Sequence, residues 1–420
     1  MNIRKGYKQT EIGVIPEDWD VYSLDQVTEA IVGGGTPSKT EKSYWENGNI
    51  YWVTPSEFTK NQSNYLDSSL EKITEKGLKN SSATLLSPGT VIMSSRATIG
   101  ECKISSVPMT TNQGFISFEC AEKLHNVYLL YLLRQLKNRV LTLSSGSTFL
   151  EVSRKTMRGF KIQLPPLEEQ KKIAAILNTV DQKIDVIDTR IEETETLKKG
   201  LMQKLLSEGI GHTEFKDSEI GRIPVGWEIV KVSDITVSHK QGYYTKEKYT
   251  QDGIYLIRIT DLMNPKISYQ NMPKLTIPEN DYKLFKVSQG DFLFARSGAI
   301  GRYGIVYEKK PAIFASYLIR FVFDKTKVLN EFFGYFYETK TAINQLLSIT
   351  QGSSNININA NNIKAITVPL PSLEEQKQIT KILSTTDDKL ETLRAKKESF
   401  ETLKQGLMQK LLTGEVRVQS

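Results

Sequence analysis

Residue types that carry out chemistry are scarce in this sequence, and those present are not spaced for a reaction. Two cysteines, Cys102 and Cys120, and three histidines lie scattered along the chain, which excludes a disulfide framework and any metal-ligand spacing. The sequence contains no GxxxxGK phosphate-binding loop, no Asn-Pro-Pro or Asp-Pro-Pro motif of an amino-methyltransferase and no histidine beside a plausible nucleophile. We therefore expect a binding protein without a metal site.

Two weaker patterns do not establish an active site. Gly33-Gly34-Gly35-Thr36 is similar to a phosphate cradle, but it lacks the strand, helix and acidic residue of a dinucleotide site, which favours a flexible loop. Acidic-x-basic pairs such as Glu101-Cys102-Lys103 and Asp281-Tyr282-Lys283 could belong to a nuclease. Roughly six such pairs are expected by chance in a chain of this composition, so each is uninformative.

Length and composition indicate a globular chain of more than one domain. The 420 residues exceed a typical domain, and 39% hydrophobic with 25% charged residues excludes collagen and wholesale disorder. Because no apolar run reaches membrane-spanning length and the first residues lack the apolar segment of a signal peptide, we expect a cytoplasmic protein. The net charge of +7 lies mostly in residues 216–366, whose 20 basic and 14 acidic residues indicate an anionic partner or an ordinary solvated surface.

The sequence is an internal repeat. Residues 197–206 (LKKGLMQKLL) recur 206 positions later as residues 403–412 (LKQGLMQKLL), and the Leu-Pro-x-Leu-Glu-Glu-Gln-Lys stretch at 164–171 recurs at 370–377. A Glu-Ile-Gly-x-Ile-Pro opening followed by a tryptophan also occurs twice. The interiors, residues 33–80 and 238–285, share little, so two similar frames hold two different contents.

Each half is predicted to contain one long helix, over residues 164–208 and 370–413. Proline and glutamates in the first turn mark each start, and Gly209 and Gly414 lie where cap glycines belong. Apolar residues recur in steps of four and three, as in the seam of a coiled coil. The predicted seam residues are Ile173, Leu177, Val180, Ile184, Ile187 and Ile191 in the first helix and Ile379, Leu383, Leu390 and Leu393 in the second.

After Ile191 the apolar phase moves to Leu197, Leu201 and Leu205, which predicts a stutter in the seam. The two helices most simply pair with each other, and a seam docked on another protein is the alternative. Between them we expect irregular α+β domains. Strand patterns occur at 50–53, 91–93, 254–259, 292–294 and 318–323, and helical patterns occur at 124–143 and 329–349.

Clusters of basic, aromatic and amide side chains favour nucleic-acid binding. One cluster precedes the first long helix, a second opens the second globular region, and a run of asparagines follows near residues 355–362. Lysine and arginine neutralise phosphates, while amide and guanidinium groups read base edges. A solvated surface explains each cluster about as well when it is taken alone. The repeat adds weight to binding, because two frames with different interiors could read two different half-sites.

Together these residues resemble the DNA specificity subunit of type I restriction-modification systems. The resemblance rests on the Gly-x-Ile-Pro-x-x-Trp openings, the Gly-Gly-Thr-Pro-Ser stretch at 34–38, the Ile-Gly turns at 99 and 300 and the Leu-Pro-x-Leu-x-Glu-Gln helix starts. It implies two mixed α/β target recognition domains separated by two helices that form an antiparallel coiled coil, in a pseudo-twofold α+β molecule. The implied boundaries are residues 1–163, 164–208, 209–369 and 370–420.

The resemblance also implies a function without catalysis. Such a chain binds one half of a bipartite, asymmetric sequence in double-stranded DNA with each domain. It docks two adenine methyltransferase subunits, which motor-nuclease restriction subunits then join. S-adenosylmethionine and ATP belong to those partners, so no cofactor is assigned here. The candidate DNA contacts are Lys39, Lys42, Arg96, Arg154, Lys155, Arg158, Lys240, Tyr243, Lys246, Lys248, Arg258, Arg296, Arg302, Arg320, Asn355 and Asn357.

The two halves depart from each other within the family pattern. Arg96 lies in the first Ile-Gly turn, whereas the second copy moves its arginine one place to Arg296, and the first copy has Phe149-Leu150-Glu151-Val152 where the second has asparagines. Identical contacts in both halves are therefore not assumed. The alternatives are a specificity chain of another, type IIB-like restriction-modification enzyme, a nuclease with a divergent site, and a coiled-coil adaptor without a role on DNA.

Overall fold

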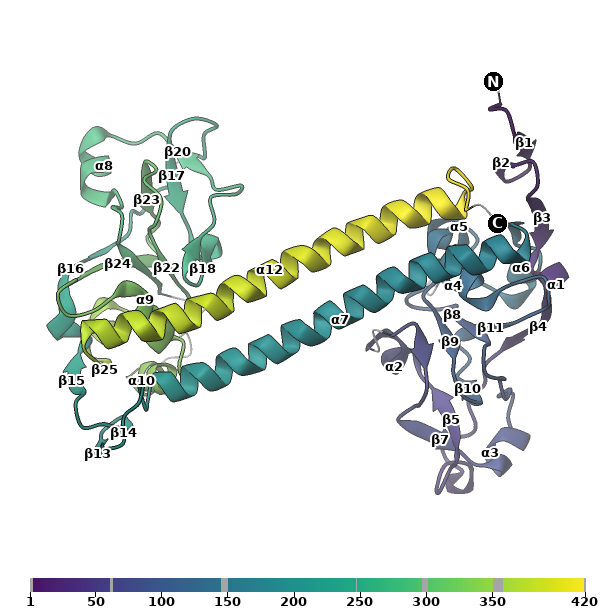
Figure 1. The fold of residues 1–420 in the computed structure, drawn as a ribbon, viewed down its shortest axis with the longest axis horizontal. Helices are drawn as coiled ribbons and strands as arrows, with labels where there is room; N and C mark the ends of the chain where they lie inside the picture. The colour runs from purple at the N-terminus through teal and green to yellow at the C-terminus, as the bar shows by residue number, and fades with distance from the viewer. Residues whose placement is uncertain are drawn as a thin grey trace. The chain divides into compact units, whose positions relative to one another are not determined.

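The computed structural model describes residues 3–60, 63–144, 150–246, 248–296, 301–349 and 358–418. They form two compact units, one of Met1–Thr189 with Arg394–Ser420 and the other of Arg190–Leu393. Each unit combines one globular domain with the beginning of one long helix and the end of the other (Figure 1). We call the globular parts the first and second domain.

The first domain contains two sheets, two strand pairs and short helices. The larger sheet has the order β4-β11-β8-β9-β6, and the smaller has the order β10-β5-β7. The strands are β1 (Tyr7–Thr10), β2 (Gly13–Pro16), β3 (Asp20–Ser23), β4 (Thr28–Gly33), β5 (Ile50–Val53), β6 (Tyr65–Leu66), β7 (Glu71–Ile73), β8 (Val91–Ser94), β9 (Cys102–Ser105), β10 (Met109–Thr111), β11 (Phe115–Cys120) and β12 (Lys161–Leu164). The helices are α1 (Leu24–Val27), η1 (Lys42–Tyr44), α2 (Pro55–Lys60), α3 (Glu75–Lys79), α4 (Asn126–Gln135), α5 (Lys137–Thr142) and α6 (Arg154–Arg158).

The second domain repeats this order. Its larger sheet is β16-β24-β21-β22 and its smaller sheet is β20-β17-β23. The strands are β13 (Phe215–Ser218), β14 (Gly221–Pro224), β15 (Glu228–Lys231), β16 (Thr236–Gln241), β17 (Ile254–Ile257), β18 (Leu262–Met263), β19 (Lys266–Ile267), β20 (Lys274–Leu275), β21 (Phe292–Ala295), β22 (Tyr303–Ile305), β23 (Ala312–Phe314), β24 (Leu318–Phe323) and β25 (Thr367–Leu370). The helices are η2 (Val232–Ile235), η3 (Ile259–Asp261), α8 (Glu279–Phe285), α9 (Asn330–Tyr337), α10 (Lys340–Ile349) and α11 (Ala360–Lys364).

The smaller sheet of each domain forms an outer lobe. We define the outer lobes as β5, β7 and β10 with η1 and α3 in the first domain, and β17, β20 and β23 with α8 in the second. In each lobe the central strand pairs in parallel with one neighbour and antiparallel with the other, and the registers correspond. Figure 1 shows both lobes on the side of their domain that lies away from the long helices.

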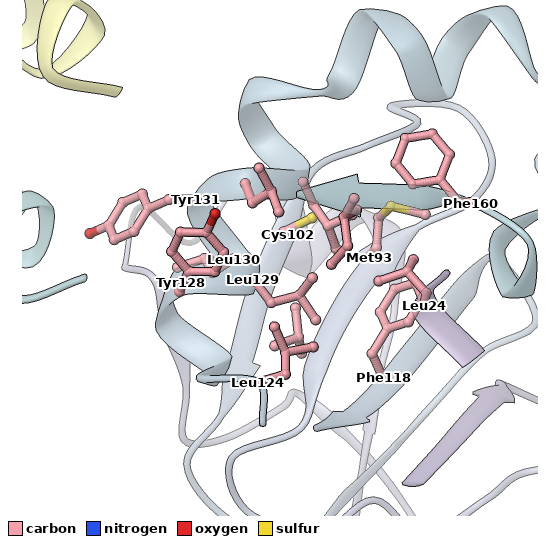
Figure 2. Packing of buried hydrophobic residues seen from close by; sticks show 14 of the residues in the cluster. Leu24, Met93, Cys102, Phe118, Leu124, Tyr128, Leu129, Leu130, Tyr131 and Phe160 are labelled. Atoms are coloured by element: carbon pink, nitrogen blue, oxygen red, sulfur yellow. The ribbon is translucent and has the colours of Figure 1, made fainter. Parts of the chain in front are cut away.

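Each domain has a core that includes residues of both long helices. In the first core, α4 supplies Tyr128 and Leu129–Leu133, which pack on strands that carry Met93, Cys102 and Phe118 (Figure 2). The second core is richer in phenylalanine, from β21, β24 and α9. The strand and helix predictions are confirmed in outline, because β5 and β24 match and the two helical patterns each break into two helices.

The long helices are α7 (Leu167–Leu205) and α12 (Leu373–Leu412). Each begins three residues later than predicted, because Leu164 and Leu370 are the last residues of the strands β12 and β25. In the first unit Lys397 lies 2.6 Å from Asp188 and Lys404 lies 2.5 Å from Asp181. Later residues of α12 thus contact earlier residues of α7, so the pairing is antiparallel. The predicted seam residues are buried or half-buried: Ile173, Leu177, Val180, Ile187, Ile379, Leu383, Leu390 and Leu393 are buried, and Ile184 and Ile191 are half-buried.

The predicted stutter after Ile191 is wrong. Thr194 is buried and only 4% exposed, and Lys198 follows it four residues on, whereas Leu197 is 52% exposed. The steps of four and three therefore continue through Thr194 and Lys198 to Leu201 and Leu205. The prediction failed because it followed apolar residues alone, while this seam includes polar side chains that find partners.

The glycine loop at residues 33–36 is packed, not flexible. The Gly35 amide donates to the Thr111 carbonyl at 2.8 Å, and the Gly35 carbonyl accepts from the indole of Trp52. A Cβ on Gly34 would lie 1.8 Å from the Asn112 carbonyl oxygen, so only glycine fits there. The loop holds two sheets together, and its amides at Gly34 and Gly35 are already bonded. In the described part of the chain, no helix has the length and apolarity to cross a membrane.

Candidate nucleic-acid interface

The first outer lobe places cationic and aromatic side chains together. The Lys39 ammonium lies 3.6 Å from the ring centroid of Trp45 and 4.8 Å from that of Trp52, and it pairs with Glu71. Lys42 on η1 is largely exposed, 4.0 Å from Glu46. A shallow hollow of about 430 Å³ lies between these residues. Lys39 and Lys42, predicted from the sequence as DNA contacts, are thus brought together on one surface.

The other predicted residues of the first domain lie outside the outer lobe, because Arg96 follows β8 and the other three belong to α6. Arg96 pairs with Glu151 at 3.0 Å, and their backbones form an isolated bridge. Arg154, Lys155 and Arg158 are exposed on α6, whose N-terminus is capped by the Ser153 hydroxyl. Arg158 lies 3.7 Å from Asp25. The structure therefore groups Arg154, Lys155 and Arg158 on one short helix.

In the second domain, the predicted residues at the end of β16 lie beside the outer lobe. The Lys240 ammonium lies 4.5 Å from the Phe285 ring centroid, and the Tyr243 hydroxyl donates to Asp281 at 3.4 Å. Lys246 and Lys248 are exposed. Because Phe285 and Asp281 belong to α8, this helix fixes the segment that carries the lysines. The arrangement leaves cationic groups available for phosphate contacts.

Three predicted arginines are engaged within the protein. Arg258 makes a bidentate pair with Asp261, which raises the pKa of the guanidinium further above its usual value. Arg302 donates to the Ile259 carbonyl at 3.4 Å. Arg320 donates to the Lys286 carbonyl at 2.7 Å, lies 3.6 Å from Asp291 and is only 19% exposed. Their role on DNA stays a prediction, and the structure gives each a role in holding the fold.

Arg296 and the asparagine run lie at one edge of the second domain. The Arg296 carbonyl accepts from the Ile358 amide at 2.7 Å, and its Nε donates back to the Ile358 carbonyl. Asn355 and Asn357 lie outside the described residues. Two later members of the run, Asn359 and Asn362, exchange side-chain hydrogen bonds with each other's backbone amides and cap α11. That part of the asparagine pattern therefore has a structural explanation.

Sequence reasoning missed a cross-strand pair that occurs in both lobes. Tyr51 on β5 lies opposite Lys72 on β7, and Tyr255 on β17 lies opposite Lys274 on β20. Each ammonium lies over its tyrosine ring, at 4.6 Å and 5.1 Å from the centroid. The strands β5 and β17 had been predicted, but β7 and β20 are only three and two residues long. Such short strands carry no alternation that a sequence pattern could reveal.

Repeated polar junctions position each domain on the helix pair. Trp19 donates its indole N–H to Glu169, which also pairs with Arg417, and Trp227 donates in the same way to Glu375, which contacts His212. These tryptophans belong to the repeated Gly-x-Ile-Pro-x-x-Trp motif, and the glutamates belong to the repeated helix starts. The motifs that revealed the repeat therefore hold each domain against a helix start.

A second polar junction in the first unit lies further along α7, at Asp181. The Tyr131 hydroxyl donates to Asp181 at 2.7 Å and Lys404 pairs with the same carboxylate. Burial acts to raise the pKa of Asp181, but the hydrogen bonds from Lys404 and Tyr131 outweigh it and hold the pKa below its ordinary value. In the second unit, Tyr335 donates to Asp387 at 2.7 Å and Lys198 pairs with it at 2.6 Å.

A cleft of about 730 Å³ lies beside the second junction of the first unit. Burial lowers the pKa of Lys103 on its wall to about 8. Five basic and five acidic side chains line the cleft, so its charges balance and it does not favour an anionic ligand. Within the described residues, no group of histidine, cysteine and carboxylate side chains could hold a metal ion.

Comparison with known proteins identifies relatives along the whole chain. The type I restriction modification DNA specificity domain matches residues 16–196 and 224–402. The chain is 30% identical to the putative type I restriction enzyme MjaX specificity subunit of Methanocaldococcus jannaschii over 99% of this chain and 98% of the relative. It is 32% identical to the MjaVIII specificity subunit of that organism over 70% of this chain and 71% of the relative.

Solved structures show the same fold at low sequence identity. The specificity subunit of the type I restriction-modification system of M. genitalium superimposes with a TM-score of 0.59 at 13% identity, covering 98% of each chain. A chain from a structure on complex assembly and conformational transition of the type I system superimposes with a TM-score of 0.57 at 16% identity, covering 96% of this chain and 99% of that one.

Proposed function

We propose, from the premise that the chain belongs to the type I restriction-modification DNA specificity family, that it reads a bipartite, asymmetric DNA sequence with one half-site per domain. The observation that supports this proposal is that the two domains share one architecture but differ in the sequence of their outer lobes. Both domains share their sheet order and both polar junctions, whereas their outer lobes differ in sequence. Two domains that are attached to the long helices in the same way, but whose outer lobes carry different residues, are suited to bind two different half-sites.

Recognition is divided between phosphate and base contacts. Exposed lysines such as Lys42, Lys246 and Lys248 neutralise phosphates and fix the register of each domain on the duplex. Base discrimination then needs only a few polar side chains in each lobe, at about 1–3 kcal/mol for each good pairing. The engaged arginines Arg258, Arg302 and Arg320 hold the surfaces that present these groups.

The chain acts as the non-catalytic subunit of a larger complex. It docks two adenine methyltransferase subunits, to which motor-nuclease restriction subunits attach, and those subunits bind S-adenosylmethionine and ATP. The names of the relatives support this, since they are specificity subunits of type I restriction enzymes. We assign the chain itself no cofactor and no catalytic residue.

Salt-dependent DNA binding tests the proposal. The recognition motif is first identified by base-resolved mapping of methylated adenines. The affinity of the purified full chain, with and without methyltransferase subunits, is then measured over a range of salt concentrations for duplexes that carry this motif and for scrambled duplexes. Affinity should fall with salt and be higher for the motif. An adaptor without a role on DNA would show neither effect. Methyl transfer or cleavage by the highly purified chain alone would instead favour a fused or divergent enzyme.

A further inference from the structure

The Tyr51–Lys72 and Tyr255–Lys274 pairs occupy equivalent places in the two outer lobes. In each lobe the tyrosine is on the central strand, and a parallel neighbour lies on its other side, β10 or β23. Both rings are half-buried and pack at the edge of the core between the two sheets of their domain. The pairs therefore recur with the same register and at equivalent places between the sheets, and the Tyr255 ring also packs edge-on against Tyr269 at 5.5 Å between ring centroids.

In the part of the chain that the structure describes, neither pair has an ion-pair partner for its lysine or a hydrogen-bond partner for its tyrosine hydroxyl. The ammonium groups of Lys72 and Lys274 have no carboxylate within ion-pair distance there, and the hydroxyls of Tyr51 and Tyr255 have no hydrogen-bond partner there. Two other lysines in or beside the outer lobes do have ion pairs: Lys39 pairs with Glu71, and Lys283 pairs with Glu279. A cation held over an aromatic ring without a counter-ion is positioned for an anion from outside.

The sequences around the two pairs differ. Tyr51 is followed by Trp52 and Tyr255 by Leu256, while Lys72 follows a glutamate and Lys274 follows a proline. A feature common to two readers of different bases suits the part of DNA that does not vary with sequence, which is the phosphate backbone. Tyrosine and lysine side chains are both among the usual phosphate donors.

We propose that each Tyr–Lys pair is a backbone clamp, in which the lysine neutralises one phosphate and the tyrosine hydroxyl donates to a neighbouring backbone oxygen of the half-site that its domain binds. This inference rests on the proposed function and adds to it a contact common to both halves. The clamp fixes the position of each lobe on the duplex, and other residues of the lobe then meet the bases.

Lysine-to-glutamine substitutions measure the clamp directly. For Lys72→Gln, Lys274→Gln and the double variant, DNA affinity is measured against salt concentration with the full chain and its methyltransferase subunits. The slope of log affinity against log salt should become shallower by about 0.9 for each lysine removed. The motif mapped by base-resolved methylation should stay the same. Lys72→Arg and Lys274→Arg should keep the wild-type slope, because they keep the charge.

Matched variants separate the clamp from a structural role. Lys283→Gln is the control for Lys274→Gln. It removes an exposed lysine of the second outer lobe that already pairs with Glu279, and it should leave the slope unchanged. Tyr51→Phe and Tyr255→Phe keep the rings, so they should weaken binding without altering the slope. Unchanged slopes in folded glutamine variants would overturn the clamp, and a changed motif would show base reading instead. If the wild-type complex shows no salt-dependent binding, the proposed function itself fails.

Discussion

At the scale of single residues, Asp181 and Asp387 do the same work in the two units. Each carboxylate accepts a hydrogen bond from a tyrosine of the domain and forms an ion pair with a lysine of the other long helix. Asp181 is buried and Lys404 is half-buried, so removing the Asp181 charge leaves the Lys404 ammonium without its ion-pair partner. The junction is thus a place where one substitution affects both a domain and the helix pair.

Replacing Asp181 should destabilise the protein. Asp181→Asn removes one charge of a mostly buried pair and should lower the free energy of unfolding by about 2 kcal/mol, measured by chemical denaturation. The matched control is Asp188→Asn, whose pair with Lys397 is more exposed and should cost less than about 1 kcal/mol. Equal losses in the two variants would contradict a special role for the junction.

The same carboxylate should contribute to acid sensitivity. Its pKa in the folded protein is held below the unfolded value of about 3.9. Its contribution to stability is therefore complete above the unfolded pKa and is lost as pH falls through the folded pKa. Unfolding followed between pH 6 and pH 2.5 should show a shallower acid decline for Asp181→Asn than for the wild type, and a parallel decline would exclude this contribution.

At the scale of elements, glycines inside the long helices and a glycine just after α7 have opposite roles. Gly200 and Gly406 lie inside α7 and α12, and a Cβ there would meet nothing within 4 Å. Gly209 follows α7 with φ of +68°, and a Cβ there would lie 2.4 Å from Glu375 and 2.8 Å from Trp227. Sequence position alone does not distinguish an unfilled glycine from a required one.

Alanine substitutions should separate these roles. Gly200→Ala and Gly406→Ala should each stabilise the isolated chain by about 0.5–1 kcal/mol, since alanine is the better helix former. Gly209→Ala should destabilise it by more than about 1 kcal/mol because of the left-handed backbone and the close contacts. Thermal unfolding of the three variants checks both signs, and a stabilised Gly209→Ala would refute the packing at the helix end.

The limits of sequence reasoning also appear at this scale. The helix starts to within three residues, the cap glycines and the strands with alternating or continuous apolar patterns were predicted, because local residue types determine them. The path of the seam through Thr194 and Lys198 was missed, since it depends on partners from distant segments. The Tyr–Lys pairs were missed because β7 and β20 are too short to show a pattern. For the candidate interface, the sequence identified cationic residues but not which of them, like Arg320, are engaged inside the fold.

At the scale of the whole molecule, we propose that the length of the helix pair sets the spacer between the two half-sites. The uninterrupted heptad seam means that seven added residues in each helix keep the register, whereas four would not. Inserting seven residues after Thr189 and after Leu393 adds about 10.5 Å, which corresponds to about three base pairs. Methylation mapping should show unchanged half-sites with a longer spacer. An unchanged spacer in an active complex would refute this role.

Exchange of one domain tests the central claim, that each domain reads its own half-site. Residues 1–163 are replaced by the equivalent region of a family member with a different specificity, while Glu169, Asp181 and the whole of α7 and α12 are kept. The hybrid is expressed with its methyltransferase partners, and modified adenines are mapped at base resolution. One half of the methylated motif should change to that of the donor, with the other half and the spacer preserved. A folded, active hybrid in which both halves change, or neither does, would contradict the account.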